Sequence, residues 1–212
     1  VGLVLGGRNL AGAAANAAWR TGDPPGYKIS LNPAITDEQL DGLKSIKGIA
    51  AMEGFLSSQV RWRRNADEAW QLVTVNARPD YAKQKLSRWR LVAGAWPTSN
   101  TVAVEWKMDA KYGLKVGDRL ELLIDERIHP VTVGGVIDAL DTSSSFANDL
   151  AIYMTRRRFG ELFGSENYTA VQAKLQPLAD GSYDWTLAEA VDMKLQERLN
   201  KLEIDSKGLL VD

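Results

Sequence analysis

Apolar residues recur at helical spacing soon after residue 36, namely Leu40, Leu43 and Ile46. Thr36 and Gln39 have the spacing of a capping box, in which each side chain bonds the backbone N–H of the other residue. Ile35 and Leu40 stand at the two positions of a hydrophobic staple, and Gly48 is a suitable residue to end a helix. The pattern therefore predicts a short amphipathic helix that begins after Thr36 and is closed by Gly48.

Strand patterns flank this helix on both sides. Two consecutive prolines at 24–25 end any helix before them, and a short strand is expected at 27–31. A longer strand is expected at 49–60, so the segment 27–60 predicts one β-α-β unit.

The same order of elements returns near the C-terminus. A strand at 150–154 is followed by Thr155, a suitable N-cap, and by a short helix that ends at Gly164. The next strand is expected at 168–175 and a last short strand at 209–211. Between them, Thr186 and Glu189 repeat the capping-box spacing. The helix that they begin has an apolar stripe of Leu187, Val191, Leu195, Leu199 and Leu202.

The middle of the chain contains mainly short strand patterns, at 70–75, 101–106, 119–124 and 130–137. Gly113 closes a single helical turn at 108–112, and the pair Gly134 and Gly135 predicts a bulge in the last of these strands. The whole pattern predicts an α+β fold. Its mixed β-α-β part, at 27–60 and 150–212, is interrupted by a β-rich insert at 61–149.

The composition fits a globular protein of one sizeable domain or two small ones, with 212 residues of which 45% are hydrophobic and 25% charged. The formal net charge of −1 gives no overall field that would attract nucleic acid or an anionic membrane. The chain has no cysteine, which excludes disulfides and thiol catalysis.

The first residues do not form a complete targeting or membrane segment. The apolar run at 1–5 is interrupted by Arg8, whereas a membrane helix needs about 20 predominantly apolar residues. The alanine-rich stretch at 10–19 is compatible with a linker, or with a helix that continues from an upstream segment. We therefore expect the chain to be a piece of a longer protein, with 1–26 as a connecting linker or helix.

No group of residues indicates catalysis, a cofactor or a metal site. His129 is the one histidine, and a lone histidine beside a strand is more often structural or solvated than catalytic. Asp138, Asp141 and Asp149 flank a polar loop that lacks the residue order of an EF-hand calcium loop, so a solvated loop is expected. The glycine-rich start at 2–7 matches neither the dinucleotide-binding motif nor the P-loop.

Basic and aromatic residues are interleaved in clusters at 61–64 and 83–90, and a third basic cluster lies at 156–158. We expect solvated faces here. An interaction surface is the second interpretation and contact with lipid headgroups the third. Trp62 and Trp89 are the candidate partner contacts. The balanced charge and the missing nucleic-acid motifs argue against nucleic acid as a partner.

Six short motifs occur in one order along the middle of the chain. They are SIKGIAAMEG at 45–54, LVAGAWP at 91–97, VAVE at 102–105, YGLKVGD at 112–118, VGGVI at 133–137 and IYM at 152–154. In this order and spacing, they resemble the extracytoplasmic (periplasmic core) domain of MacB/FtsX-like ABC transporter permeases. The sequence departs from the family at Lys47, where proline is common, and at Trp106, in a run that often carries small residues.

The resemblance implies a domain that lies between the first and second membrane helices of a permease, on the periplasmic or extracellular side of the cell membrane. It implies a porter-like α/β part at 27–60 and 150–212, a sabre-like β-rich part at 61–149, and a membrane-proximal segment at 1–26. The implied function is non-catalytic: the domain relays ATP-driven motion to a substrate or partner outside the membrane.

The implied partners are a cytoplasmic ABC ATPase, reached through the membrane helices, and a second permease copy or a partner permease. An extracytoplasmic adaptor, a lipoprotein or the substrate itself would meet the domain outside the membrane. Two other functions stay open on the sequence alone. One is a stand-alone secreted module that binds a lipid, carbohydrate or peptide in an apolar pocket. The other is a hydrolase that uses Asp138 and Asp141.

Overall fold

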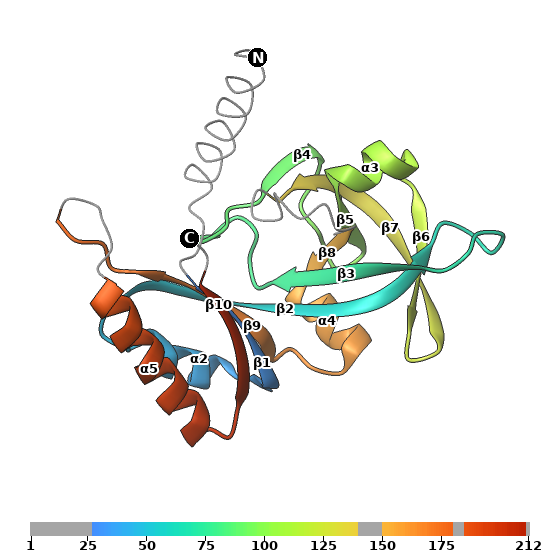
Figure 1. The fold of residues 1–212 in the computed structure, drawn as a ribbon. Coiled ribbons are helices and arrows are strands. Elements are labelled where there is room, and N and C mark those ends of the chain that lie inside the picture. The colour runs from blue at the N-terminus through green and yellow to red at the C-terminus, as the bar shows by residue number, and fades with distance from the viewer. Residues whose placement is uncertain (1–26, 140–149, 180–184, 211–212) are drawn as a thin grey trace, which may run out of the picture.

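The structure is a computed structural model that describes residues 27–139, 150–179 and 185–210. Within these ranges, ten strands join into one mixed sheet that four helices flank. The sheet has two parts at opposite ends of the molecule, which we call the open half and the closed half (Figure 1). The open half is a four-stranded sheet, and the closed half is a sheet whose first and last strands pair.

The open half has the strand order β10-β1-β9-β2, and all its neighbouring strands are antiparallel. Its strands are β1 (Tyr27–Ile35), β9 (Tyr168–Leu175), β10 (Asp205–Leu210) and the first part of β2 (Ile49–Arg63). Two helices, α2 (Asp37–Lys44) and α5 (Trp185–Lys201), lie side by side against the sheet (Figure 1). Arg198 joins them, because its Nη1 donates to the carbonyl oxygen of Gly42 at 2.8 Å.

The predicted capping box of α2 is confirmed. Thr36 Oγ1 accepts from the N–H of Gln39 at 3.2 Å, and Gln39 Oε1 accepts from the N–H of Thr36 at 2.9 Å. The predicted role of Gly48 is wrong, since the helix already ends at Lys44 with Ser45 as its C-cap. Gly48 instead has φ of +102° just before β2, where a Cβ would lie 2.7 Å from Val191 Cγ2.

The predicted apolar stripe of α5 is confirmed as far as Leu199. Val191, Leu195 and Leu199 are fully buried, whereas Leu202 lies beyond the helix and is exposed. The predicted cap at Thr186 is wrong, because the helix already includes Trp185.

The closed half contains six strands that pair in a circle, β2-β3-β8-β5-β7-β6 and back to β2. The additional strands are β3 (Gln71–Arg78), β5 (Thr101–Glu105), β6 (Arg119–Ile124), β7 (Arg127–Asp138) and β8 (Ala151–Thr155). A further strand, β4 (Arg90–Gly94), pairs with β7, and the helices α3 (Trp106–Tyr112) and α4 (Arg156–Phe163) follow β5 and β8. The predicted bulge is confirmed, because Val133 and Gly135 lie opposite Val102 and Ala103 and leave Gly134 unpaired between them.

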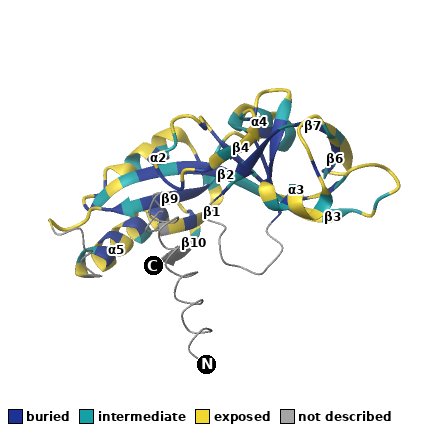
Figure 2. Ribbon diagram, turned by 90° about the horizontal axis from the view of Figure 1, so that it is seen from above, coloured by how far each residue is buried: buried dark blue, intermediate teal, exposed yellow. Residues whose placement is uncertain are grey.

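One hydrophobic core continues through both halves (Figure 2). It includes Ile29 and Leu195 of the open half together with Leu120 and Val104 of the closed half. The α+β fold class is therefore confirmed as a single packed unit. No helix in the described ranges is long and apolar enough to cross a membrane.

The strand pairing shifts one predicted boundary. The sequence assigned 150–212 to the α/β part, but β8 pairs with β3 and β5 of the closed half, and α4 follows it there. The chain returns to the open half only at Tyr168. The reason is that Ala151–Met154 is buried on both faces, as a central strand of the closed half requires.

Candidate functional site at the junction of the two halves

A single long strand passes from one half of the molecule to the other. Residues 49–55 of β2 pair with β9, and residues 56–62 pair with β3. At about 3.3 Å per residue, the 15 residues of β2 span about 50 Å. Two separate groups of polar side chains each join residues across the junction that β2 forms.

The first polar group surrounds Arg78, which ends β3 and is 3% exposed. Its guanidinium donates to Glu53 Oε2 on β2 at 3.3 Å and to Gln172 Oε1 on β9 at 3.0 Å. It also donates to the carbonyl oxygen of Leu86 at 3.0 Å. Glu53 in turn accepts from the N–H groups of Lys85 and Leu86, at 2.9 and 3.0 Å. These bonds attach the loop after β3 to β2 and β9, two neighbouring strands of the open half.

The second polar group joins α2, α4 and β9. Arg156 forms a bidentate ion pair with Asp37, at 2.9 and 2.8 Å, and donates to the hydroxyl of Tyr168 at 2.6 Å. The hydroxyl of Tyr168 also donates to Asp37 Oδ1 at 2.8 Å. The bonds from Arg156 and Tyr168 lower the pKa of Asp37 to about 2. Since Arg156 begins α4 in the closed half and Asp37 begins α2 in the open half, this pair joins the two halves.

The position of Tyr168 also explains why residue 54, at the centre of the junction, is a glycine. Its aromatic ring lies over Gly54 of β2, where an added Cβ would be 2.5 Å from Tyr168 Cγ. Any larger residue would push the tyrosine away from Arg156 and Asp37.

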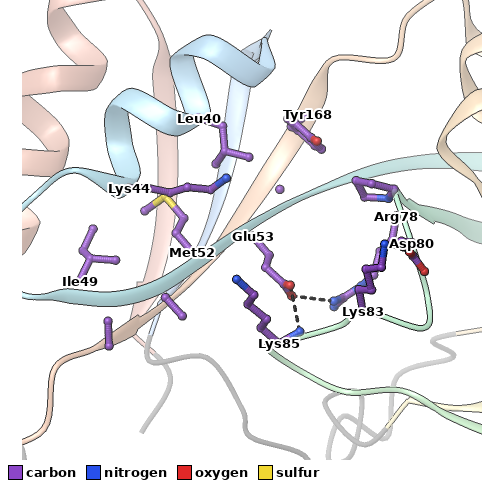
Figure 3. Close-up of a pocket in the computed structure, with 14 residues that line it drawn as sticks. Leu40, Lys44, Ile49, Met52, Glu53, Arg78, Asp80, Lys83, Lys85 and Tyr168 are labelled. Carbon is purple, nitrogen blue, oxygen red and sulfur yellow. Dashed lines mark hydrogen bonds and ion pairs between the residues drawn. The ribbon is translucent and has the colours of Figure 1, made fainter.

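A cavity of about 410 Å³ lies beside β2 at the junction (Figure 3). Leu40, Lys44 and Tyr168 line it on one side of the strand, and Glu53 and Lys85 line it on the other. The cavity is thus lined by both apolar and charged side chains. It differs from the deep apolar pocket expected of a stand-alone binding module.

The structure places both candidate tryptophans in the interior. Trp62 is 0% exposed, and its aromatic ring packs edge-on against Tyr112 at 5.1 Å. Trp89 is 6% exposed, 4.6 Å from the aromatic ring of Tyr153 and 4.1 Å from the guanidinium of Arg78. The expectation that these residues face a partner is therefore wrong. The alternation of Arg61, Trp62 and Arg63 in a strand contained the signal, since the tryptophan must point away from its two neighbours.

The basic clusters are largely engaged in ion pairs. Arg63 pairs with Glu121 at 2.6 Å, and both Arg157 and Arg158 pair with Glu161. These contacts fit the expected solvated faces.

The other candidate residues form no site in the described part of the chain. Asp138 pairs with Arg90 at 2.8 Å, and His129 is half-buried on β7 opposite Leu122. Asp141 and Asp149 lie outside the described residues. In the described ranges, no group of three or more histidine, aspartate or glutamate side chains could hold a metal ion. The junction residues could not be recognised in the sequence, because their partners lie up to 131 positions apart.

Comparisons with known proteins agree with this architecture. The family model of the MacB-like periplasmic core domain matches residues 8–190. A search of curated proteins gave no match.

Three solved structures share the fold. The extracellular domain of the noncanonic ABC-type transporter YknZ from Gram-positive bacteria is 17% identical, with a TM-score of 0.54 over 87% of this chain and 100% of that one. The periplasmic region of MacB from Actinobacillus actinomycetemcomitans is 12% identical, with a TM-score of 0.55 over 86% and 89%. A domain of a putative permease protein from Porphyromonas gingivalis is 15% identical, with a TM-score of 0.52 over 88% and 90%.

The family model covers most of the chain, and the solved structures have the same fold. The resemblance seen in the sequence motifs is thereby confirmed. This chain belongs to the MacB-like periplasmic core domains of ABC transporter permeases.

Proposed function

We propose that this domain relays ATP-driven motion from membrane helices to a substrate or partner outside the membrane, without chemistry of its own. The observation that carries the proposal is the pairing of the first and last described strands. Tyr27 at the start of β1 lies opposite Leu210 at the end of β10. Segments that continue from these two residues start side by side, as two neighbouring membrane helices require.

Motion applied at this point has a continuous path through the molecule. β1 pairs with β9, β9 pairs with β2, and β2 continues into the closed half. The shared core and the two polar groups at the junction oppose bending between the halves. The domain would thus move as one rigid body, with the open half as the porter-like part and the closed half as the sabre-like part.

The surface that meets a partner is proposed to lie at the far end of the closed half. Leu72, Arg61, Leu123 and Ile128 are directly opposite one another on four neighbouring strands, so their side chains share one face. Leu72 is 60% exposed and Ile128 is 50% exposed. Apolar side chains around an arginine are typical of the centre of a protein interface. We therefore propose this row as the partner contact instead of Trp62 and Trp89, which are buried. The partner there would be an adaptor, a lipoprotein or the substrate.

The relay is tested in a full-length permease reconstituted in lipid with its cytoplasmic ABC ATPase. The exposed residues Ile128 and Met193 lie in the closed and open halves, and each is replaced by a cysteine that carries a spin label. This domain brings no cysteine of its own. We expect ATP to change the distance between the Ile128→Cys labels of two permease copies. The distance between labels at 128 and 193 within one copy should stay the same.

Two results would contradict the proposal. If the distance between the copies is unchanged through the ATPase cycle, the domain does not move with the membrane helices. If the distance between labels at 128 and 193 changes, the domain bends at the junction and is no rigid relay. A copy labelled at both positions is diluted with unlabelled protein, so that only distances within one copy are measured.

A further inference from the structure

Among the described residues, one edge of β2 has no strand beside it in the open half. Residues 49–55 pair with β9 on one edge, and β3 joins the opposite edge only from Leu56 onward. Among the described residues, no strand pairs with that opposite edge at 49–55. Every second residue of such an edge presents its N–H and C=O groups outward, which makes the edge a template for a further strand.

The cavity at the junction lies along this free edge. Six consecutive residues of β2, 49–54, line it (Figure 3). The loop after β3 closes the far end of the cavity, where Glu53 accepts from the N–H groups of Lys85 and Leu86. The result is a groove that runs along an unpaired strand edge and stops where the end of β3 joins β2 at Leu56.

The groove carries an excess of positive charge. Lys44, Arg78, Lys83 and Lys85 line it, against only two carboxylates, Glu53 and Asp80. The Glu53 carboxylate is already bonded to Arg78 and to the loop. Lys44 and Lys83 have only exposed partners within three residues, and Lys85 makes no ion pair with the described residues. Exposed pairs of this kind are weak, so these lysines can exchange them for a ligand.

We propose that the free edge of β2 binds an extended acidic peptide segment of a partner protein by strand addition. Main-chain hydrogen bonds to residues 49–54 would give affinity, and the two sides of the groove would give specificity. Side chains of an added strand alternate between the two faces of the sheet. One set would meet the apolar side chains Leu40 and Tyr168, and the other would meet Lys83 and Lys85 (Figure 3).

The recognised segment therefore has apolar residues at alternate positions and acidic residues between them. Lysines along an edge also oppose its pairing with a second copy of the same edge, so an acidic strand is favoured over self-pairing. This inference concerns a different surface from the relay contact and does not depend on it.

The test uses the 212-residue chain and a fluorescein-labelled peptide of eight residues in which valine and glutamate alternate. We expect this peptide to bind in a fluorescence anisotropy titration and to slow hydrogen exchange of the amides in residues 49–55. Two control peptides should bind roughly tenfold more weakly or not at all. One has lysine in place of glutamate, and the other is N-methylated at every second residue, so that it lacks half of its N–H donors.

The matched protein variants reverse charge inside and outside the groove. Lys83→Glu combined with Lys85→Glu should weaken binding roughly tenfold, since each replaces an attraction by a repulsion. Lys115→Glu combined with Lys201→Glu makes the same change at two exposed positions that do not line the groove, and should bind as the native chain does. If the first variant unfolds, Lys83→Gln combined with Lys85→Gln repeats the test, because it removes the two positive charges without adding carboxylates to the loop.

Four results would overturn the proposal. The first is no binding of the valine–glutamate peptide, and the second is equal binding to the native and Lys83/Lys85 variants. The third is equal binding of the N-methylated peptide, which would mean attraction to surface lysines without a main-chain pairing. Protection of amides elsewhere than 49–55 would likewise place the peptide on another surface.

Discussion

Glu105 is a fully buried carboxyl in the closed half, at the end of β5. Its Oε2 accepts from the hydroxyl of Tyr153 at 2.5 Å, and its Oε1 lies 3.5 Å from the N–H of Ala139. Burial raises the pKa of Glu105 to about 7, because the charged form loses its hydration. Glu53 is a contrasting case, since it is only partly buried and lies beside the guanidinium of Arg78. Two carboxyls of one domain thus have different environments that the sequence alone does not distinguish.

The raised pKa makes stability depend on pH in a defined direction. The contribution of Glu105 is fully present below its unfolded value of about 4.5 and is lost as the pH rises through about 7. Glu105→Gln removes this dependence, because the amide stays neutral and still accepts from Tyr153. The free energy of unfolding of the variant, relative to the native chain, should therefore rise by about 3 kcal/mol between pH 4.5 and pH 8.

Urea denaturation of both proteins across that pH range measures the difference. Glu38→Gln, at an exposed position on α2, is the control for the loss of a carboxylate. A difference between Glu105→Gln and the native chain that stays constant with pH would show that the buried carboxyl does not titrate in this range.

Local residue patterns were the most predictable part of the molecule. Thr36 with Gln39, and Thr155 as the N-cap of α4, were read correctly because a cap depends on residues three positions apart. Arg78 was not recognised, since its partners Glu53 and Gln172 lie 25 and 94 positions away. Only the folded chain brings such residues together.

At the scale of elements, β2 determines how the two halves are joined. The sequence predicted its beginning at residue 49, but placed its end at 60 and not at Arg63. The predicted strand was correct because apolar residues are frequent along it. Its passage from one half to the other could not be predicted, because pairing partners are not encoded in the alternation of a single strand.

Gly54 is the most constrained position of this element. Gly54→Ala should lower the free energy of unfolding by about 2 kcal/mol, because the added methyl group overlaps the aromatic ring of Tyr168. Thermal or urea unfolding measures the change. Gly42→Ala is the matched control. Its Cβ meets only Arg198 Nη1 at 3.8 Å, and alanine in place of glycine should stabilise α2 by up to about 1 kcal/mol. Unchanged stability of Gly54→Ala would mean that Tyr168 moves aside freely.

At the scale of the whole molecule, the continuous core makes the two halves one cooperative unit. We expect a single unfolding transition in urea, with the same midpoint for tryptophan fluorescence and far-ultraviolet circular dichroism. The buried Trp62 and Trp89 report on the closed half, whereas α2 and α5 supply most of the helical signal from the open half. Two separate midpoints would contradict a shared core.

The order of helices and strands was predictable from the sequence, but the circular pairing of strands in the closed half was not. Two β-α-β segments around a strand-rich middle were visible in the pattern, because apolar periodicity is a local property. β4 was missed as a strand, since its residues are mostly exposed and do not alternate. The membership of β8 in the closed half was missed because a strand buried on both faces gives no indication of its neighbours.

The pairing of Tyr27 with Leu210 has a consequence for how such a domain can be inherited. Residues directly opposite each other on antiparallel strands have Cα atoms about 5 Å apart. We therefore expect that inserting residues 27–210 between two neighbouring residues of a host protein leaves the host's adjoining segments where they were. A fold whose two ends lie this close can be exchanged between hosts as one cassette.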